Sequence, residues 1–280
     1  MYAVFVPEFI VIFIINACTL IVFARSRHLR KRTTYLIINL TVADLLVGAV
    51  SGPLHIYHSL KIKPGSGFSW QKFNVMVFED TFAISSIANL CLISLERLHA
   101  TLYPFRHCLI GKLTYIKTIL CIWSLALTKA SVIATLYLHE PAAYRYLWGS
   151  FIFLSLLIIT TSYAIIIAKV KSNSPRNHFG LVAPERKLSV TLFIVSVVSV
   201  LTILPWVFNA VIQVHAFNRL SKSTQTFITY LVDVLFYASS FVNPLVYAIR
   251  MQEFRKAARL LSCKKTTESR NFQDIELHAI

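Results

Sequence analysis

The chain has 280 residues, of which 56% are hydrophobic and only 14% are charged, and its mean hydropathy is +0.64. Soluble globular proteins usually have about a quarter charged residues, so this composition excludes an ordinary soluble domain. The net charge of +16 could suggest a nucleic-acid-binding protein, but its distribution along the chain, described below, favours a membrane protein instead. The five cysteines show neither metal-ligand spacing nor the paired pattern of a secreted disulfide framework.

The first apolar run, residues 3–24, is followed by five basic residues between positions 25 and 32. A cleaved signal peptide carries its basic residues before the apolar run. We therefore interpret this run as an uncleaved first membrane helix whose N-terminus lies outside the cell. About seven residues precede the membrane in this interpretation, so we expect no large folded ectodomain.

Six further apolar runs have the length of membrane helices. They cover residues 34–60, 71–103, 113–138, 146–170, 188–215 and 224–250. A loop around HEPAAYRY precedes the fifth run; after the seventh, residues 251–262 predict an amphipathic surface helix and 263–280 a disordered cytoplasmic tail. Runs of this length exclude barrel strands, so we predict an all-α membrane protein with a seven-transmembrane helix bundle over residues 1–262.

The basic residues alternate with the predicted helices. The segments after helices one, three, five and seven hold 21 of the 28 Lys and Arg residues, the opposite side holds six, and Lys129 lies inside helix four. This bias predicts an outside N-terminus and explains the net charge without nucleic acid. We expect Lys129 to face a neighbouring helix and pair with an acid.

Helix three carries charge near both ends. Glu79 and Arg97 are eighteen residues apart, which places them on one helix face roughly 27 Å apart, close to the thickness of a bilayer core. Toward the outside, the predicted ligand-binding residues are Glu79, Asp80, Asp233 and Tyr237, with a cationic ligand group as the partner of the acids. Internal pairing of the acids with Lys72, Arg145 or Lys222 is the alternative.

Asp44 lies at mid-membrane depth, where an isolated carboxylate is costly. Ser86, Ser239, Ser240 and Asn243 are predicted at similar depth, with Ser239 chosen as the helix-seven hydroxyl of the site. A carboxylate with hydroxyl and amide oxygens suits a hydrated hard cation. A hydrogen-bonded network with water is the alternative. We interpret Ser196 and Ser199 as packing between helices or bonding to their own backbone.

The predicted switch residues gather toward the cytoplasmic side. Glu96 and Arg97 end helix three, and an Arg97–Glu185 pair would hold helix six in place, although snorkelling of Arg97 to the interface is the alternative. Pro205 should kink helix six, and Asn243-Pro244 with Tyr247 should break helix seven.

These motifs together resemble the rhodopsin-like (class A) G protein-coupled receptors over nearly the whole chain. The matching residues are NLTVADLL with Asp44, ERL at 96–98, Trp123, Tyr163, Pro205, NPLVY at 243–247, and Phe254. The resemblance implies an extracellular small ligand, for which a cationic amine, a short peptide and a lipid are the candidate classes. It also implies a heterotrimeric G protein partner, a plasma-membrane location and no enzymatic activity. It also implies a sodium ion at Asp44, and roles for Arg97, Tyr163 and Tyr247 in switching.

Three departures from the family pattern concern the ligand class. Lys72 replaces the cysteine that usually bonds to the second outer loop, Ile203 replaces the helix-six tryptophan, and Ser155 replaces the helix-five proline. The chain is similar in style to melanocortin, cannabinoid and amine receptors. An orphan or decoy receptor without G-protein signalling is one alternative function, and a small transporter or channel is another. Cys263 is a predicted palmitoylation site, with an unmodified interfacial cysteine as the alternative.

Overall fold

The computed structural model describes residues 2–26, 29, 34–62, 67–172, 183–215, 221–251 and 254–260, and their regular structure is helical throughout. The elements are α1 (Tyr2–Arg25), α2 (Thr34–Leu46), η2 (Val47–Ser51), α3 (Gly52–Lys61), α4 (Trp70–Leu102), α5 (Pro104–Leu109), α6 (Lys112–His139), α7 (Pro141–Ser172), α8 (Ala183–His215) and α9 (Lys222–Arg250). A last helix covers residues 254–260.

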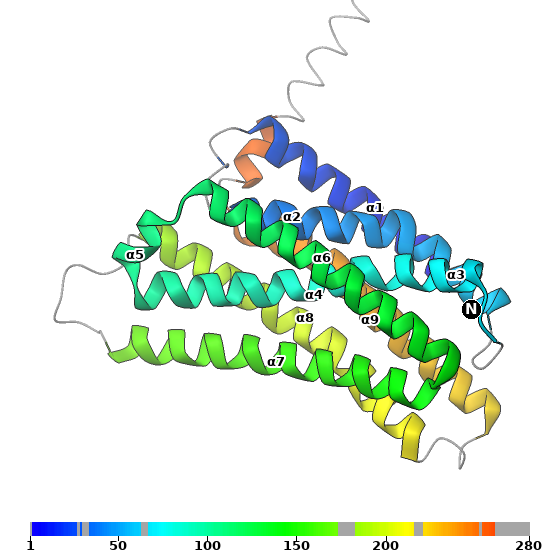
Figure 1. Cartoon of the computed structure of the whole chain (residues 1–280). Helices are drawn as coiled ribbons and strands as arrows, with labels where there is room; N and C mark the ends of the chain where they lie inside the picture. Colours follow the sequence, from blue (N-terminus) through cyan, green and yellow to red (C-terminus); the bar gives the residue numbers. More distant parts are fainter. Residues whose placement is uncertain are drawn as a thin grey trace, which may run out of the picture.

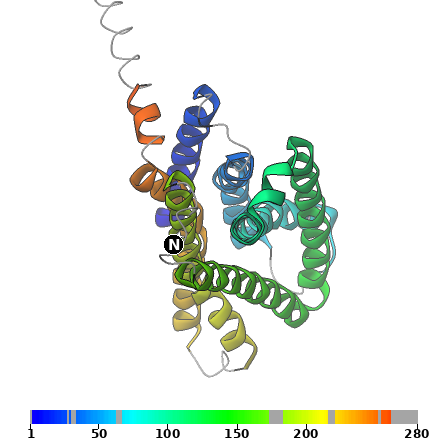
Figure 2. The same ribbon diagram turned by 90° about the vertical axis from the view of Figure 1, so that its left-hand side faces the viewer.

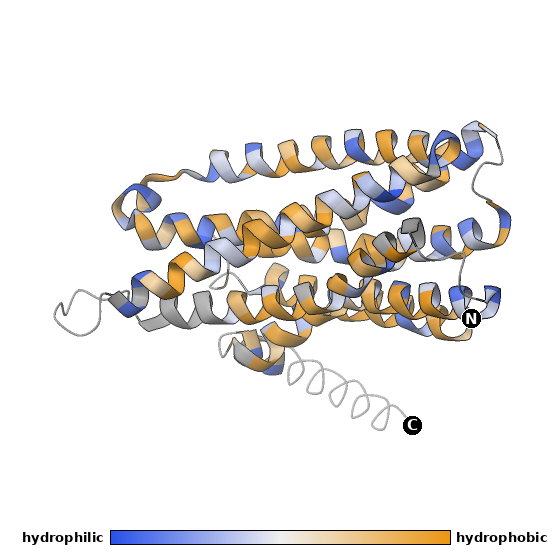
Figure 3. Ribbon diagram, turned by 90° about the horizontal axis from the view of Figure 1, so that it is seen from below, coloured by the Kyte–Doolittle hydropathy of each residue, from blue (hydrophilic) through white to orange (hydrophobic). Residues whose placement is uncertain are grey.

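Seven of the described helical runs are long and apolar enough to cross a membrane, and α2, η2 and α3 together form one of them. The long helices lie side by side in one bundle (Figure 1). Apolar residues dominate their lengths (Figure 3), as lipid contact requires. The predicted all-α bundle of seven spans is therefore confirmed. Asp44 lies in α2 and Tyr163 lies in α7. The N-terminus lies at the end of the bundle that is marked N in Figure 1.

Helix α4 is the central element of the bundle. It packs against α2, η2, α3, α5, α6, α7 and α8. In its most apolar 18-residue window 72% of the residues are buried, against 28% in the corresponding windows of α1 and α6. A helix with so many neighbours has no continuous lipid face, which explains why it tolerates more polar side chains than the peripheral spans.

The second span is not the single α-helix that we predicted for residues 34–60. It contains a π-helical turn, η2, between α2 and α3. Pro53 lies in the first turn of α3 and cannot donate a backbone hydrogen bond to the turn before it. A π turn accommodates this lost donor by adding a residue to the helix, and such turns recur at functional positions.

The predicted loop before the fifth span is shorter than expected, and the segment after α4 contains an additional helix. The prediction of a loop around HEPAAYRY is wrong, because α6 ends at His139 and α7 begins at Pro141, with only Glu140 between them. Proline suits the first position of a helix, where its missing N–H has no partner in any case. The segment after α4 also contains a short helix, α5, which likewise begins at a proline, Pro104.

The predicted surface helix is described over residues 254–260. Phe254 and Ala257 are buried and Arg255 and Lys256 are exposed, so the helix is amphipathic as expected. Phe254 packs on Phe23 of α1 at 5.4 Å between ring centroids, and Figure 2 shows this orange helix beside the blue α1. The rest of the tail, including Cys263, lies outside the described residues.

Helices α8 and α9 contain the two prolines that were predicted to deform them. Pro205 lies inside α8 and Pro244 inside α9. The predicted break at Asn243-Pro244 is wrong, since α9 continues without interruption to Arg250. A proline removes one backbone donor, but the surrounding turns can retain helical geometry when packing holds them.

Candidate functional site

A polar cavity of about 360 Å³ lies toward the end of the bundle where α1 begins. Its walls come from α3, α4, α6, α7, α8 and α9. All four residues predicted to bind a ligand line it, namely Glu79, Asp80, Asp233 and Tyr237. The structure therefore brings together acids from two helices that are separated by more than half of the chain.

Glu79 is held by two histidines of α3. Its Oε1 lies 2.8 Å from Nδ1 of His55, and its Oε2 lies 2.6 Å from Nδ1 of His58. Among the described residues, the ion pairs of Glu79 are with these two histidines and not with the basic residues considered above. Nζ of Lys72 donates to the backbone oxygen of Gly67 at 3.5 Å. The missed signal was the i, i+3 spacing of the two histidines, which places both on one face of α3.

Asp80 of α4 also lines the cavity, and Lys129 of α6 is one of its electrostatic neighbours. Lys129 interacts electrostatically with Asp80, but the two form no ion pair among the described residues, so the expected pairing stays a prediction. Its Nζ lies 4.3 Å from the ring centroid of Phe151 and 5.3 Å from that of Trp148, so aromatic faces also stabilise the ammonium. No described atom accepts a hydrogen bond from this Nζ.

Asp233 on α9 has a different environment. Its electrostatic neighbours are His55, His58 and Glu79, and Glu8 of α1 also interacts with it. Among the described residues, no side chain forms an ion pair with Asp233. Both carboxylate oxygens of Glu8 are buried without a hydrogen-bond partner in the described part of the chain.

An aromatic wall closes the cavity toward the bundle centre. Trp148 lies 5.5 Å from Trp206 and 5.9 Å from Phe236 between ring centroids, and all three line the cavity. Trp206 directly follows Pro205, whereas Ile203 is 2% exposed and lies in the hydrophobic core. In α8, the tryptophan that lines the cavity is therefore Trp206, three positions after Ile203, which occupies the usual tryptophan position.

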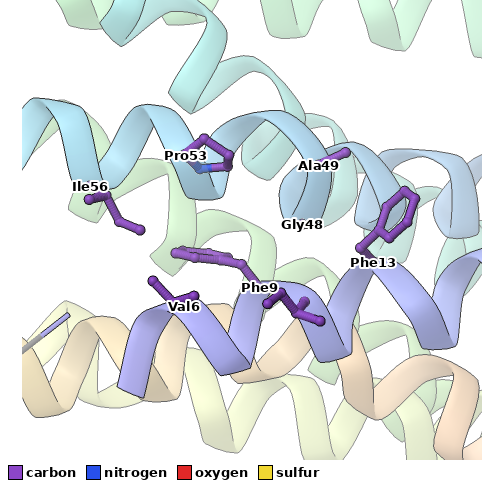
Figure 4. Close-up of a pocket in the computed structure, with 8 residues that line it drawn as sticks. Val6, Phe9, Phe13, Gly48, Ala49, Pro53 and Ile56 are labelled. Carbon is purple, nitrogen blue, oxygen red and sulfur yellow. The ribbon is translucent and has the colours of Figure 1, made fainter. Parts of the chain in front are cut away.

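A second cavity, of about 620 Å³, is an apolar groove between α1 and the run η2–α3 (Figure 4). It is lined by Val6, Phe9, Ile10, Phe13, Gly48, Ala49, Pro53 and Ile56. Phe9 separates it from the polar cavity, because its ring packs 4.9 Å from that of Tyr237. Although larger, this groove has no side chain that could bind a charged group, so the polar cavity is the better candidate.

Asp44 is fully buried at the middle of the bundle and satisfied on both oxygens. Ser86 donates to its Oδ1 at 2.6 Å and Asn243 donates to its Oδ2 at 2.7 Å. Ser199 donates to Oδ1 of Asn243 at 3.2 Å, so our interpretation of Ser199 as simple packing is wrong.

One predicted member of the Asp44 cluster is misplaced. The hydroxyl of Ser239 donates to the backbone oxygen of Phe236 at 2.7 Å. The hydroxyl of its neighbour Ser240 interacts with the Asp44 carboxylate instead. Asn16 of α1 donates to the backbone oxygen of Ser240 at 3.1 Å, and its own Oδ1 is buried without a partner among the described residues. The set of carboxylate, hydroxyl and amide oxygens fits a hard cation or a water.

Arg97 lies at the other end of α4 and is 4% exposed. Its Nη2 donates to Oε1 of Glu96 at 2.6 Å, and Nε2 of His107 lies 2.8 Å from the same oxygen. The hydroxyl of Tyr115 donates to it at 3.3 Å. The proposed partner Glu185 has a side chain outside the described part of the structure. Arg97 is thus held by its neighbour in the chain, and burial excludes simple snorkelling.

Two buried tyrosines lie between this end and the Asp44 cluster. The hydroxyl of Tyr163 accepts a hydrogen bond from Ser196 at 3.4 Å. Tyr247 is fully buried, and its hydroxyl has no hydrogen-bond partner in the described residues. A buried hydroxyl without a hydrogen-bond partner costs free energy. A rearrangement that gives the Tyr247 hydroxyl a partner would therefore be favourable.

Comparison with known proteins agrees with this arrangement. The family model described as 7 transmembrane receptor (rhodopsin family) matches residues 15–247. The Allatostatin-A receptor of Bombyx mori is 27% identical over 268 residues, which cover 87% of this chain and 74% of that receptor. Trace amine-associated receptor 2 of Rattus norvegicus is 24% identical over 91% of this chain and 82% of its own. Neuropeptide FF receptor 2 of Mus musculus is 29% identical over 51% of this chain and 35% of its own.

Proposed function

This chain belongs to the rhodopsin family of seven-transmembrane receptors, and we propose that it couples an extracellular ligand with a cationic group to heterotrimeric G proteins at the plasma membrane. It is a multi-pass membrane receptor and not an enzyme. The observation that carries the proposal is the position of α4, which contributes acids to the polar cavity and Arg97 to the opposite end.

The charge of the cavity supports a cationic ligand. Three carboxylates line it, namely those of Glu79, Asp80 and Asp233, and Glu8 lies nearby. Aromatic faces of Trp148, Trp206 and Phe236 would cover the apolar body of such a ligand. The names of the relatives include a trace amine-associated receptor and a neuropeptide FF receptor, so an amine or the basic end of a short peptide is the favoured class.

The mechanism is a population shift. A ligand that binds one arrangement of α4, α8 and α9 more tightly stabilises that arrangement. At the other end, Arg97 would leave Glu96 and become available to the G protein, while Tyr247 gains a hydrogen-bond partner. The cavity opens to the outside in this proposal, which requires an extracellular N-terminus, and the basic bias of the opposite loops supports it.

We also propose that a sodium ion binds beside Asp44. Ser86, Ser240 and Asn243 would hold it together with the carboxylate, and the unpartnered Oδ1 of Asn16 fits a water in its shell. The ion would supply the positive charge that a fully buried carboxylate otherwise lacks. Ligand binding that moves α9 would change this coordination.

The test of coupling replaces Arg97 with alanine. We expect basal and amine-driven G-protein activation in cells to fall by at least about ten-fold, since a buried guanidinium is lost from the coupling end. Arg255→Ala, on the exposed face of the last helix, is the matched control and should keep normal signalling. Equal surface expression must be verified for both variants. Unchanged signalling in Arg97→Ala would contradict the proposal, and silence of the natural chain with every G-protein class would favour a decoy receptor.

A further inference from the structure

The acids of the polar cavity are not equivalent, and the structure separates them by what already neutralises each one. This separation bears on where a ligand cation binds, and it rests on the proposed function above. From it we infer that the cation-binding carboxylate is Asp233 of α9, supported by Glu8 of α1, and not Glu79 of α4.

Glu79 is already fully engaged. Each of its two oxygens lies within 2.8 Å of a histidine Nδ1, and the residue is 8% exposed. A ligand ammonium at Glu79 would compete with His55 and His58 for the same carboxylate and weaken the hydrogen bonds of these buried imidazoles. Glu79 therefore acts as a positioning residue that joins α4 to α3, and Ser51 reinforces the junction by donating to its backbone oxygen at 2.7 Å.

Asp80 has a permanent cation near it. Lys129 interacts with it electrostatically from α6, and His58 does so from α3. The ammonium of Lys129 is buried over Phe151 and Trp148, so it cannot leave for water without losing these contacts. If Asp80 paired with a ligand cation instead, Lys129 would be left as an uncompensated charge in the membrane.

Asp233 differs from Glu79 and Asp80 because, among the described residues, it has neither a close histidine contact nor a lysine or arginine among its electrostatic neighbours. It lines the cavity, and within the described ranges no side chain forms an ion pair with it. The Nδ1 atoms of the nearby His55 and His58 are directed to Glu79. Arg145 also lines the cavity but forms no ion pair with these acids among the described residues.

Glu8 strengthens this assignment from the neighbouring helix. Its carboxylate is buried, lacks a hydrogen-bond partner in the described part of the chain, and interacts with Asp233. Two carboxylates that share a low-dielectric site repel each other unless a cation or a proton joins them. A ligand ammonium at Asp233 would relieve this repulsion, which gives the cavity a preference for positive charge at the α1–α9 side.

The test measures this preference with small charged thiol reagents in place of a ligand. Thr229 lines the same cavity one helical turn before Asp233, so Thr229→Cys places a thiol beside it. The full chain in lipid nanodiscs is treated with the cationic reagent 2-aminoethyl methanethiosulfonate or the anionic reagent 2-sulfonatoethyl methanethiosulfonate. Mass spectrometry of the peptide that contains position 229 gives the two modification rates and their ratio.

We expect the cationic reagent to react faster, and Asp233→Asn to lower the rate ratio about ten-fold, as for one charge at ~6 Å with an effective dielectric constant of roughly 40. Asp233→Glu should retain the ratio, which separates charge from folding. Glu79→Gln and Asp80→Asn should change it less than about two-fold.

Two outcomes would overturn the inference in different ways. If Glu79→Gln or Asp80→Asn lowered the ratio as much as Asp233→Asn, the cation site would belong to that residue while a cationic ligand remained supported. If Thr229→Cys alone showed no preference for the cationic reagent, the inference and the cationic ligand class would both fail. The Arg97 experiment would still decide G-protein coupling separately.

Discussion

At the scale of single residues, Asp44 combines the greatest burial with the clearest set of oxygen neighbours. It is 0% exposed and accepts hydrogen bonds from Ser86 and Asn243. Both donors come from other helices, α4 and α9, so the cluster joins three spans at one point. A cation bound here would stabilise the packed arrangement of those spans, because it binds the folded chain and not the unfolded one.

We predict that replacing sodium with N-methylglucamine lowers the thermal unfolding temperature of the receptor in nanodiscs. At about ten times the dissociation constant, the ion would contribute about 1.4 kcal/mol to the free energy of unfolding. Asp44→Asn and Ser86→Ala should abolish the sodium effect. Ser239→Ala is the control, since its hydroxyl bonds to its own backbone and the effect should persist. A sodium effect of equal size in Asp44→Asn would exclude the site.

The individual acids were easier to identify than their partners. Intramembrane charge is rare, so Glu79, Asp80, Asp233 and Asp44 could all be selected from the sequence. The partner of Glu79 could not, since His55 and His58 lie on a different helix and become neighbours only when α3 packs on α4. Ser239 and Ser240 were both candidates in the sequence, and the choice of Ser239 was wrong by one residue of helix phase, because Ser240 interacts with Asp44.

At the scale of elements, the contact of α1 with η2 depends on a missing side chain. A Cβ at Gly48 would lie 2.7 Å from the backbone nitrogen of Phe13 and 2.9 Å from the backbone oxygen of Phe9. Backbone atoms cannot rotate away as a side chain can. The two helices therefore approach as closely as they do because position 48 is glycine.

We predict that Gly48→Ala destabilises the receptor by about 1–3 kcal/mol, as for overpacking in a filled core. Gly149→Ala is the matched control in α7, where a new Cβ meets no atom within 4 Å. That variant should be neutral or gain up to ~1 kcal/mol from helix propensity. Thermal unfolding of both variants in nanodiscs measures the difference. An equal response of the two glycines would contradict the close approach.

The existence of the helices was predictable, but two of their details were not. Long apolar runs identify spans because the bilayer requires them. The π turn of η2 and the immediate start of α7 at Pro141 have no comparable signal. Proline is compatible with a kink, a π turn or a helix start, and packing against neighbouring helices selects among them.

At the scale of the whole molecule, the distribution of charge predicts the topology. With 21 of 28 basic residues on one side, the N-terminus should lie outside the cell. An epitope before residue 1 should be detected on intact cells, and an epitope after residue 280 only after permeabilisation. Replacing the five basic residues of 25–32 with glutamine should reduce the share of correctly oriented chains. Detection of the C-terminal epitope on intact cells would contradict the assignment.

The sequence by itself determined the membrane class, the number of spans and the receptor family, since these depend on hydrophobic length and on motifs local to each helix. The tertiary structure decided which partner each charged side chain has. Asp233 and Glu79 are indistinguishable in sequence as acids of the same cavity, yet only packing brings two histidines to Glu79. Helix periodicity defines a face, whereas the neighbour of that face is set by how the helices associate.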